Sequence, residues 1–289
     1  MKSSEVRLPA SKLQGIRLVI CDMDGTALNR EKEFSSGMLA AWSALRKAGI
    51  PYTIASARAP SMLGVFCAQA EISNIPVITL EGALVVNWPG GEILYERLME
   101  EADAERVMEY CHESGLDYTV YTARRAYLRR DTRRGWRFEK YNALADRYGL
   151  ERVKTAVYEE FSPQSISREG VYKIFVDNPN DGCTEKLKRF LRGMARVRTD
   201  SSEGMSITVM HEAVSKGEAL RLLLAHMGIS KEQVCCFGDW YNDLDMLASC
   251  PHSVAMGNAV PEIKQAAGYV TYSNDDDGAA YFINQYLLK

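Results

Sequence analysis

Two acidic clusters follow apolar runs that are typical of buried strands. Asp22 and Asp24 come directly after residues 16–21, and Asp239 comes shortly after residues 234–237. Because open α/β sheets bind ligands at the carboxyl ends of their strands, these carboxylates are expected to face one crevice. Crowded carboxylates repel one another unless a cation lies among them, and Mg²⁺ takes few carboxylates while keeping water and phosphate ligands. The pattern therefore predicts a magnesium site.

Two further polar side chains are placed where they could reach the same crevice. Ser56 ends the second apolar run, and Lys216 stands at the start of a helical period. A hydroxyl and an ammonium group both bind phosphate oxygens, which favours phosphate chemistry. Each residue alone has a simpler interpretation, because serine caps helices and a first-turn lysine is usually solvated. The same holds for Asp239 and Asn242, either of which could serve only as a helix cap.

Four motifs, taken in order, resemble those of the haloacid dehalogenase superfamily, and within it the Cof-type phosphatases with a C2-type α/β cap. The matching segments are residues 22–26 (Asp-Met-Asp-Gly-Thr), Ser56, residues 215–220 (Ser-Lys-Gly-Glu-Ala-Leu) and residues 238–243 (Gly-Asp-Trp-Tyr-Asn-Asp). Residues 257–259, Lys264 and residues 277–278 are similar to the family's closing pattern. The resemblance covers nearly the whole expected core, whereas the inserted segment is similar mainly in length and type.

The resemblance implies an aspartyl-phosphate mechanism. Asp22 would be the nucleophile, and Asp24 would protonate the leaving oxygen and then take a proton from water. Mg²⁺ would be held by Asp22, the backbone carbonyl of Asp24, and Asp239. Asp243 would support the waters of the metal or the ammonium group of Lys216. These four aspartates are the predicted metal residues.

The resemblance also implies the phosphate-binding groups and the reaction. Ser56 and Lys216 would stabilise the transferring oxygens, and Asn242 would reach the phosphate. The implied enzyme is a Mg²⁺-dependent phosphomonoester hydrolase that acts on small metabolites such as sugar phosphates or phosphorylated cofactors. Two alternatives stay open: a phosphomutase of the same fold, and a non-catalytic binding module that retains the fold.

Three residues depart from the family pattern. Ala57 stands where the family usually has glycine, which is tolerable if its φ is negative. Glu81 replaces the usual asparagine at the entry to the inserted segment, and a carboxylate there would disfavour an anionic leaving group nearby. Trp240 replaces a small residue, and its side chain could either pack in the core or form a wall of the substrate pocket.

Alternating strand and helix signals must position these residues. The expected fold is α/β, a Rossmann-like three-layer core with a parallel sheet and an inserted α+β cap. After Gly82 a turn-rich cluster at residues 87–91 predicts a β-hairpin, which does not belong in a continuing parallel sheet. We therefore expect a discontinuous catalytic core at residues 1–82 and 207–289, and a substrate-specificity cap at residues 83–206.

Seven arginines lie close together in the expected cap, at positions 124, 125, 129, 130, 133, 134 and 137, with aromatic residues among them. Such a run could bind RNA or a phosphorylated ligand. A solvated surface balanced by nearby acids is the favoured interpretation, because the whole chain carries a net charge of −3. No nucleic-acid partner is therefore expected, and the predicted partner is a small phosphate ester.

Composition excludes other classes of protein. Of the 289 residues, 46% are hydrophobic and 25% are charged, the balance of a globular protein rather than a disordered or fibrous one. Seven cysteines without C-x-x-C spacing favour a reducing compartment, and no segment reaches the length of a membrane span. We expect a cytoplasmic protein with no membrane partner, as a monomer or a homodimer.

Overall fold

The computed structural model describes residues 6–177, 181–202 and 206–288. The chain divides into two compact units. The core unit comprises Met1–Arg58, Phe66–Tyr95 and Ser215–Lys289, and the inserted unit comprises Ala59–Val65 and Glu96–Val214. The sequence analysis placed the boundaries after residues 82 and 206. In the structure the core unit includes residues 83–95 as well, and it resumes at Ser215.

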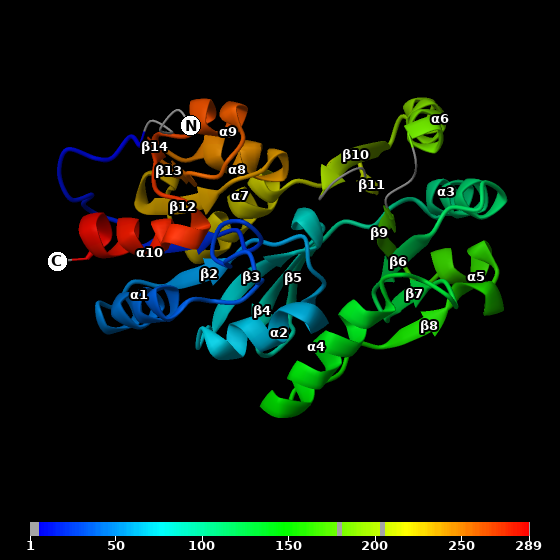
Figure 1. Ribbon diagram of the computed structural model, residues 1–289, viewed down its shortest axis with the longest axis horizontal. Helices are drawn as coiled ribbons and strands as arrows, with labels where there is room; N and C mark the ends of the chain where they lie inside the picture. The colour runs from blue at the N-terminus through cyan, green and yellow to red at the C-terminus, as the bar shows by residue number, and fades with distance from the viewer. Residues whose placement is uncertain (1–5, 178–180, 203–205, 289) are drawn as a thin grey trace. The chain divides into compact units, whose positions relative to one another are not determined.

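A parallel sheet forms the centre of the core unit (Figure 1). Its strands lie in the order β14-β13-β12-β1-β2, and all neighbouring pairs are parallel. The strands are β1 (Leu18–Cys21), β2 (Tyr52–Ile54), β12 (Val234–Gly238), β13 (His252–Ala255) and β14 (Tyr269–Val270). This arrangement confirms the predicted α/β architecture with a parallel core sheet.

Helices form two groups around this sheet. These helices are α1 (Ser36–Lys47), α7 (Lys216–Met227), α8 (Leu244–Ser249), α9 (Pro261–Ala266) and α10 (Gly278–Phe282), while α2 (Pro60–Gln69) is divided between the two units. Helix α1 packs against α10, whereas α8 packs against both α7 and α9. The chain moves along the sheet in opposite directions after β1 and after β12, so right-handed crossovers place α1 and α8 on opposite faces. The result is a three-layer core.

The expected hairpin is present but belongs to the core unit. Strands β3 (Ile75–Thr79), β4 (Leu84–Trp88) and β5 (Ile93–Glu96) form a separate three-stranded sheet. Strand β3 continues beside β2 through a parallel bridge between Ala55 and Ile78. The short turn Leu80–Gly82 links β3 to β4, so the residues expected at the entry to the cap lie inside the core unit.

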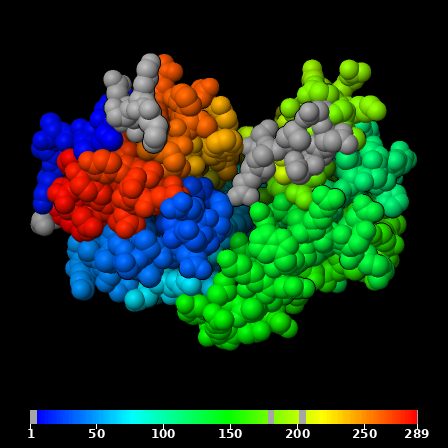
Figure 2. All heavy atoms as spheres, in the orientation of Figure 1, coloured from blue at the N-terminus to red at the C-terminus, as the bar shows by residue number. Residues whose placement is uncertain are grey.

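Residues 7–13 are hydrogen-bonded to the C-terminal part of the core unit. The backbone N–H of Arg7 donates to the carbonyl of Val270 at 2.9 Å, and that of Leu13 donates to Tyr286 at 2.8 Å. Figure 2 shows the corresponding blue and red surfaces next to each other. The segment before β1 therefore stabilises the C-terminal helices.

The inserted unit is built on a six-stranded sheet in the order β10-β11-β9-β6-β7-β8. Its strands are β6 (Tyr118–Thr122), β7 (Ala126–Leu128), β8 (Thr155–Val157), β9 (Val171–Val176), β10 (Val197–Ser202) and β11 (Ser206–His211). Its helices are α3 (Glu101–Glu113), α4 (Gly135–Tyr148), α5 (Pro163–Ser167) and α6 (Asp181–Arg192). Alternate residues of the strands, such as Val120, Ile174 and Val209, pack into one hydrophobic core with Val107 and Leu187. The expected α+β character is confirmed, but strand β11 lies across the predicted boundary at residue 206.

Among the described residues, none of the helices is both long and apolar enough to cross a bilayer.

Candidate active site

Asp22 and Lys216 form a buried ion pair at the carboxyl end of β1. Asp22 directly follows this strand and is 6% exposed, and Lys216 is completely buried. The Lys216 Nζ donates to Asp22 Oδ1 at 2.6 Å and to Asp243 Oδ1 at 2.7 Å. Lys216 is the first residue of α7, and the N-cap Ser215 precedes it. The Ser215 hydroxyl accepts from the Glu218 N–H at 3.0 Å. The helix cap therefore fixes the lysine beside both carboxylates.

Three buried carboxylates meet at this point, those of Asp22, Asp239 and Asp243. One oxygen from each lies within 4.8 Å of the others. Asp239 follows β12, and the turn Tyr241–Asp243 carries Asp243 back toward it. Asp243 Oδ2 accepts the backbone N–H of Asp239 at 3.0 Å, which fixes the position of the two residues. The predicted convergence of distant strand ends is therefore present in the folded chain.

Burial and mutual repulsion shift the protonation of this cluster. Burial raises the pKa of Asp22 well above its usual value, although Lys216 opposes the shift. Burial, followed by the charge of Asp243, raises the pKa of Asp239 to about 7. Burial would lower the pKa of Lys216, but the charges of Asp22 and Asp243 outweigh it and raise that pKa. Lys216 thus remains a cation, while the three carboxylates repel one another.

The donor set fits a hard divalent cation. The three carboxylates supply oxygen ligands, and Lys216 compensates only one of their charges. The hydroxyl of Thr26 donates to Asp239 Oδ1 at 2.8 Å, which orients that carboxylate. A Cβ on Gly25, whose φ is +88°, would clash with the Asp239 carboxyl group, so this position requires glycine. The sequence thus keeps the loop after β1 close to Asp239.

The raised pKa of Asp239 predicts a pH-dependent stability without divalent cations. In the unfolded chain Asp239 ionises near 3.8, and in the folded chain near 7, so the folded state binds more protons between these values. We therefore expect Tm, measured in EDTA, to fall as the pH rises through this window, by roughly 10 °C. Mg²⁺ should raise Tm more at about pH 8 than at about pH 5, because its ligands must be deprotonated.

The control for this prediction compares two aspartates of the same region. Asp239→Asn should flatten the pH dependence of Tm, whereas Asp245→Asn, on the exposed surface of α8, should leave the slope unchanged. A wild-type Tm that rises from pH 4 to 7 in EDTA would contradict the assigned electrostatics.

The side chain of Asp24 stands apart from this cluster. Its carboxylate receives two hydrogen bonds from Arg58, Nε to Oδ2 at 2.9 Å and Nη2 to Oδ1 at 2.7 Å, and an ion pair from Lys32 at 3.1 Å. Burial alone would raise the pKa of Asp24, but Arg58 and Lys32 outweigh it and hold that pKa well below its usual range. Asp24 is therefore ionised in this arrangement. The residue pattern predicted the Asp24 carboxylate beside those of Asp22 and Asp239, but the structure pairs it with Arg58 and Lys32 instead. The resemblance implied only its backbone carbonyl as a metal ligand, and that expectation stays a prediction.

Ser56 and Asn242 lie on two loops of the same edge. The Ala55 N–H donates to the Cys21 carbonyl at 2.9 Å, which places the buried Ser56 at the strand end next to Asp22. The Ser56 hydroxyl accepts from the Arg58 N–H at 3.2 Å. Asn242 lies in the turn that carries Asp243, and its Nδ2 donates to Glu81 Oε2 at 2.8 Å. All seven predicted site residues thus belong to the core unit.

Several residues of this site were given no role by the sequence. Arg58 holds Asp24, and Thr26 and Asn258 both contact Asp239, the latter from Nδ2 to Oδ2 at 3.4 Å. Thr26 and Asn258 belong to recognised segments, residues 22–26 and 257–259, and Arg58 lies two positions after Ser56. The motifs therefore contained the signal, but spacing alone did not reveal these contacts.

The departures from the family pattern have different outcomes. Ala57 has a negative φ, as required for a residue with a Cβ. Trp240 is 37% exposed and packs edge-on against Tyr241, so the interpretation as a core residue is wrong. Glu81 is buried and contacts Asn242, a contact that the sequence did not predict.

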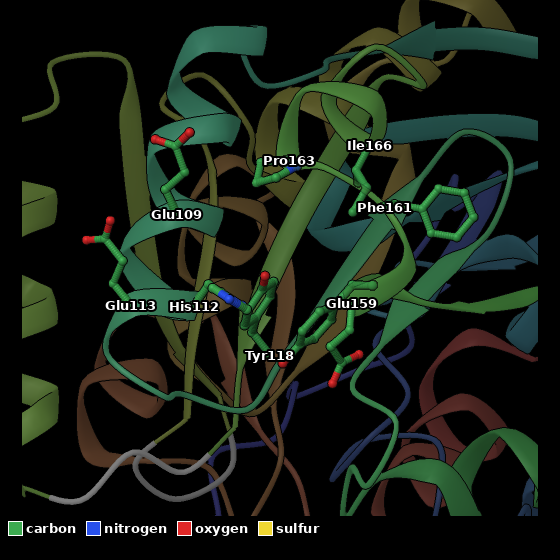
Figure 3. A pocket seen from close by; sticks show the side chains of 9 residues that line it. Glu109, His112, Glu113, Tyr118, Glu159, Phe161, Pro163 and Ile166 are labelled. Atoms are coloured by element: carbon green, nitrogen blue, oxygen red, sulfur yellow. The ribbon is translucent and has the colours of Figure 1, made fainter.

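The arginine run lies in the inserted unit and pairs with acids there. Arg125, Arg129, Arg130 and Arg134 form ion pairs with Glu169, Asp131, Glu160 and Asp177, respectively. This pairing is the one expected of a balanced surface. The inserted unit also has a pocket of about 350 Å³, in which His112 and Tyr118 lie between Glu113 and Glu159 (Figure 3). Its lining includes none of the predicted site residues.

Comparisons with known proteins identify the family. The haloacid dehalogenase-like hydrolase family matches residues 19–283, so the chain belongs to this family of hydrolases. The predicted superfamily and enzyme class are confirmed.

Particular relatives match along nearly their whole length. The chain is 26% identical over 287 residues to the 5-amino-6-(5-phospho-D-ribitylamino)uracil phosphatase YwtE of Bacillus subtilis, covering 94% of this chain and 98% of the relative. It is 28% identical over 297 residues to the phosphatase YwpJ of the same organism, covering 94% and 100%. A haloacid dehalogenase-like hydrolase from Bacteroides thetaiotaomicron has the same fold, with a TM-score of 0.79, 23% identity, and 93% and 98% coverage.

Proposed function

We propose that the protein is a Mg²⁺-dependent phosphatase that hydrolyses small phosphate monoesters through a phosphoryl group on Asp22. The observation that carries this proposal is the buried pairing of Asp22 with Lys216, beside Asp239 and Asp243. A carboxylate at a strand end, held by a lysine in a cluster of oxygen ligands, suits attack on phosphorus. The names of both Bacillus subtilis relatives support the same reaction class.

In the first step an oxygen of Asp22 attacks the phosphorus atom. A bond forms between this oxygen and phosphorus while the bond from phosphorus to the ester oxygen breaks, and the electron pair leaves with that oxygen. The ammonium group of Lys216, 2.6 Å from Asp22, orients the nucleophile and offsets charge on the phosphoryl oxygens. Ser56 and Asn242 are proposed to bind the same oxygens.

Asp24 is proposed to move the protons of both steps. It protonates the leaving oxygen, and then takes a proton from the water that attacks phosphorus, which releases phosphate and restores Asp22. The ion pairs with Arg58 and Lys32 keep Asp24 ionised, so the carboxyl group must leave Arg58 to carry the first proton. The second, basic role matches the ionised state described above.

Mg²⁺ would be held by Asp22, Asp239 and the backbone carbonyl of Asp24, with Asp243 supporting it. When bound, the ion neutralises charge on the nucleophile and on the phosphoryl group.

The substrate is proposed to be a small phosphorylated metabolite, such as a sugar phosphate or a phosphorylated cofactor precursor. The substrate in the name of YwtE, a phosphorylated ribitylaminouracil, is of this class. We assign catalysis to the core unit and substrate selection to the inserted unit. This division is proposed because every predicted site residue lies in the core unit.

The test is phosphate release from a panel of phosphate monoesters with Mg²⁺ or with excess EDTA. We expect turnover with Mg²⁺ and a loss of about a hundredfold or more with EDTA, restored by adding the metal. Hexose 1-phosphate separates the alternatives, because a phosphatase releases inorganic phosphate whereas a mutase yields the 6-phosphate. The absence of turnover on every ester would contradict the proposed function.

A further inference from the structure

The turn between β3 and β4 has an unusual backbone. Leu80, Glu81 and Gly82 have φ values of 51°, 62° and 97°, so three successive residues are in the left-handed region. Glycine adopts this conformation readily, but residues with a Cβ adopt it at a cost. Such strain persists where surrounding contacts impose it, and it is common at functional sites. The turn contacts two segments of the candidate site, the loop after β2 and the start of α7.

The backbone of the turn holds the loop after β2. The Glu81 N–H donates to the Ser56 carbonyl at 3.1 Å, and the Leu80 N–H donates to the Arg58 carbonyl at 3.0 Å. Both bonds join the start of the turn to the same segment of the chain. The loop that carries Ser56 is thereby fixed.

The same turn packs against the start of α7. A Cβ on Gly82 would clash with the carbonyl oxygen of Ser215, the residue that precedes Lys216. The backbone of the turn at Gly82 therefore lies so close to the backbone of Ser215 that no side chain fits between them. The charge of Glu81 also contributes to the raised pKa of Lys216, after those of Asp22 and Asp243.

The Glu81 side chain holds the third phosphate-binding candidate. Glu81 is 2% exposed, and its Oε2 accepts a hydrogen bond from Asn242 Nδ2 at 2.8 Å. A carboxylate acceptor makes this bond stronger than a neutral pair would. With one amide N–H bound to Glu81, the plane of the Asn242 amide is fixed.

The geometry points to Glu81 as a positioning residue that sets Ser56, Lys216 and Asn242 in place for the phosphoryl group. This inference rests on the proposed function. Glu81 reaches the three groups by different routes: its N–H bonds the Ser56 loop, its turn packs on the helix start before Lys216, and its carboxylate orients Asn242. Glu81 acts on Asn242 chiefly through one hydrogen bond, which makes that pair testable.

A double-mutant cycle on Glu81 and Asn242 tests the inference. Glu81→Ala and Asn242→Ala should each lower kcat/KM for the best phosphate ester by about 10- to 100-fold, mainly through a higher KM. The double variant should lose little more than either single variant, because both remove one interaction. Glu81→Gln keeps an acceptor for Asn242, and it should lose less than about fivefold.

A matched control separates positioning from general stability. In the exposed hairpin, Asn87 Nδ2 donates to Glu92 Oε2 at 2.9 Å, the same type of bond in the same unit. Glu92→Ala should leave KM and kcat unchanged. Tm is measured for every variant, and kinetics are taken well below the lowest value.

The outcomes are distinct. Additive losses, or a Glu81→Ala variant with the KM of the wild type, would overturn the inference while the proposed function stands. A wild-type protein without turnover contradicts the proposed function instead. In that case the test is the increase in Tm that orthophosphate causes in the presence of Mg²⁺. If the wild type shows this increase and both single variants lose it, the inference is supported. If the wild type shows no increase, or if Glu81→Ala keeps it, the inference is overturned.

Discussion

The Asp22→Asn variant should lose activity by about a thousandfold or more in kcat. Asparagine has the size of aspartate but is a poor nucleophile, so the covalent step cannot occur, while the contacts of the backbone after β1 remain. The measurement is hydrolysis of para-nitrophenyl phosphate in Mg²⁺ under saturating conditions. The charge of Asp22 is repelled by those of Asp243 and Asp239, and Lys216 keeps its bond to Asp243, so the substitution should not lower Tm strongly.

The control for this variant is an unchanged fold, measured by circular dichroism and Tm. A folded Asp22→Asn protein with more than a tenth of the wild-type kcat would show that another residue attacks phosphorus.

The Lys216→Met variant should lose both activity and stability. Methionine is close to lysine in length but carries no charge, so Asp22 and Asp243 lose the cation that lies 2.6 and 2.7 Å from them. Removing one member of a buried ion pair costs about 3–5 kcal/mol, which corresponds to a decrease in Tm of roughly 10 °C. The loss of charge near the phosphoryl group should lower kcat by about 100-fold.

Both effects of Lys216→Met are measured on one preparation, kcat at a temperature where the variant is folded and Tm in EDTA. Lys231→Met, on an exposed turn, serves as the control and should change neither quantity. A Lys216→Met protein as stable as the wild type would contradict the assigned buried ion pair.

The sequence predicted the parts of this fold that local pattern determines. The apolar runs before Asp22 and Asp239 are strands, and both carboxylates lie at the strand ends where a parallel sheet gathers its ligands. A helix begins with Lys216, as expected from the sequence. These predictions succeeded because strand and helix periodicity depends on neighbours along the chain.

Other features depend on contacts between distant residues and could not be predicted in this way. Strand β11 pairs with β9 and β10, which are neighbours that the local sequence pattern does not specify. Glu81 and Asn242 are 161 positions apart, and no spacing rule joins them. In the sequence, Arg58 is visible only as a near neighbour of Ser56. The bond from Arg58 to Asp24 forms because the loops after β1 and β2 face each other in the fold.

The central claim is that Asp22 carries the phosphoryl group, and one measurement tests it directly. The enzyme is mixed with excess phosphate ester and Mg²⁺, quenched in acid within one turnover, reduced with borohydride, and digested for peptide mass spectrometry. We expect the peptide that contains Asp22 to carry homoserine at that position, the reduction product of an acyl phosphate. Phosphate release with the adduct on another residue, or with no adduct at any quench time, would contradict the account.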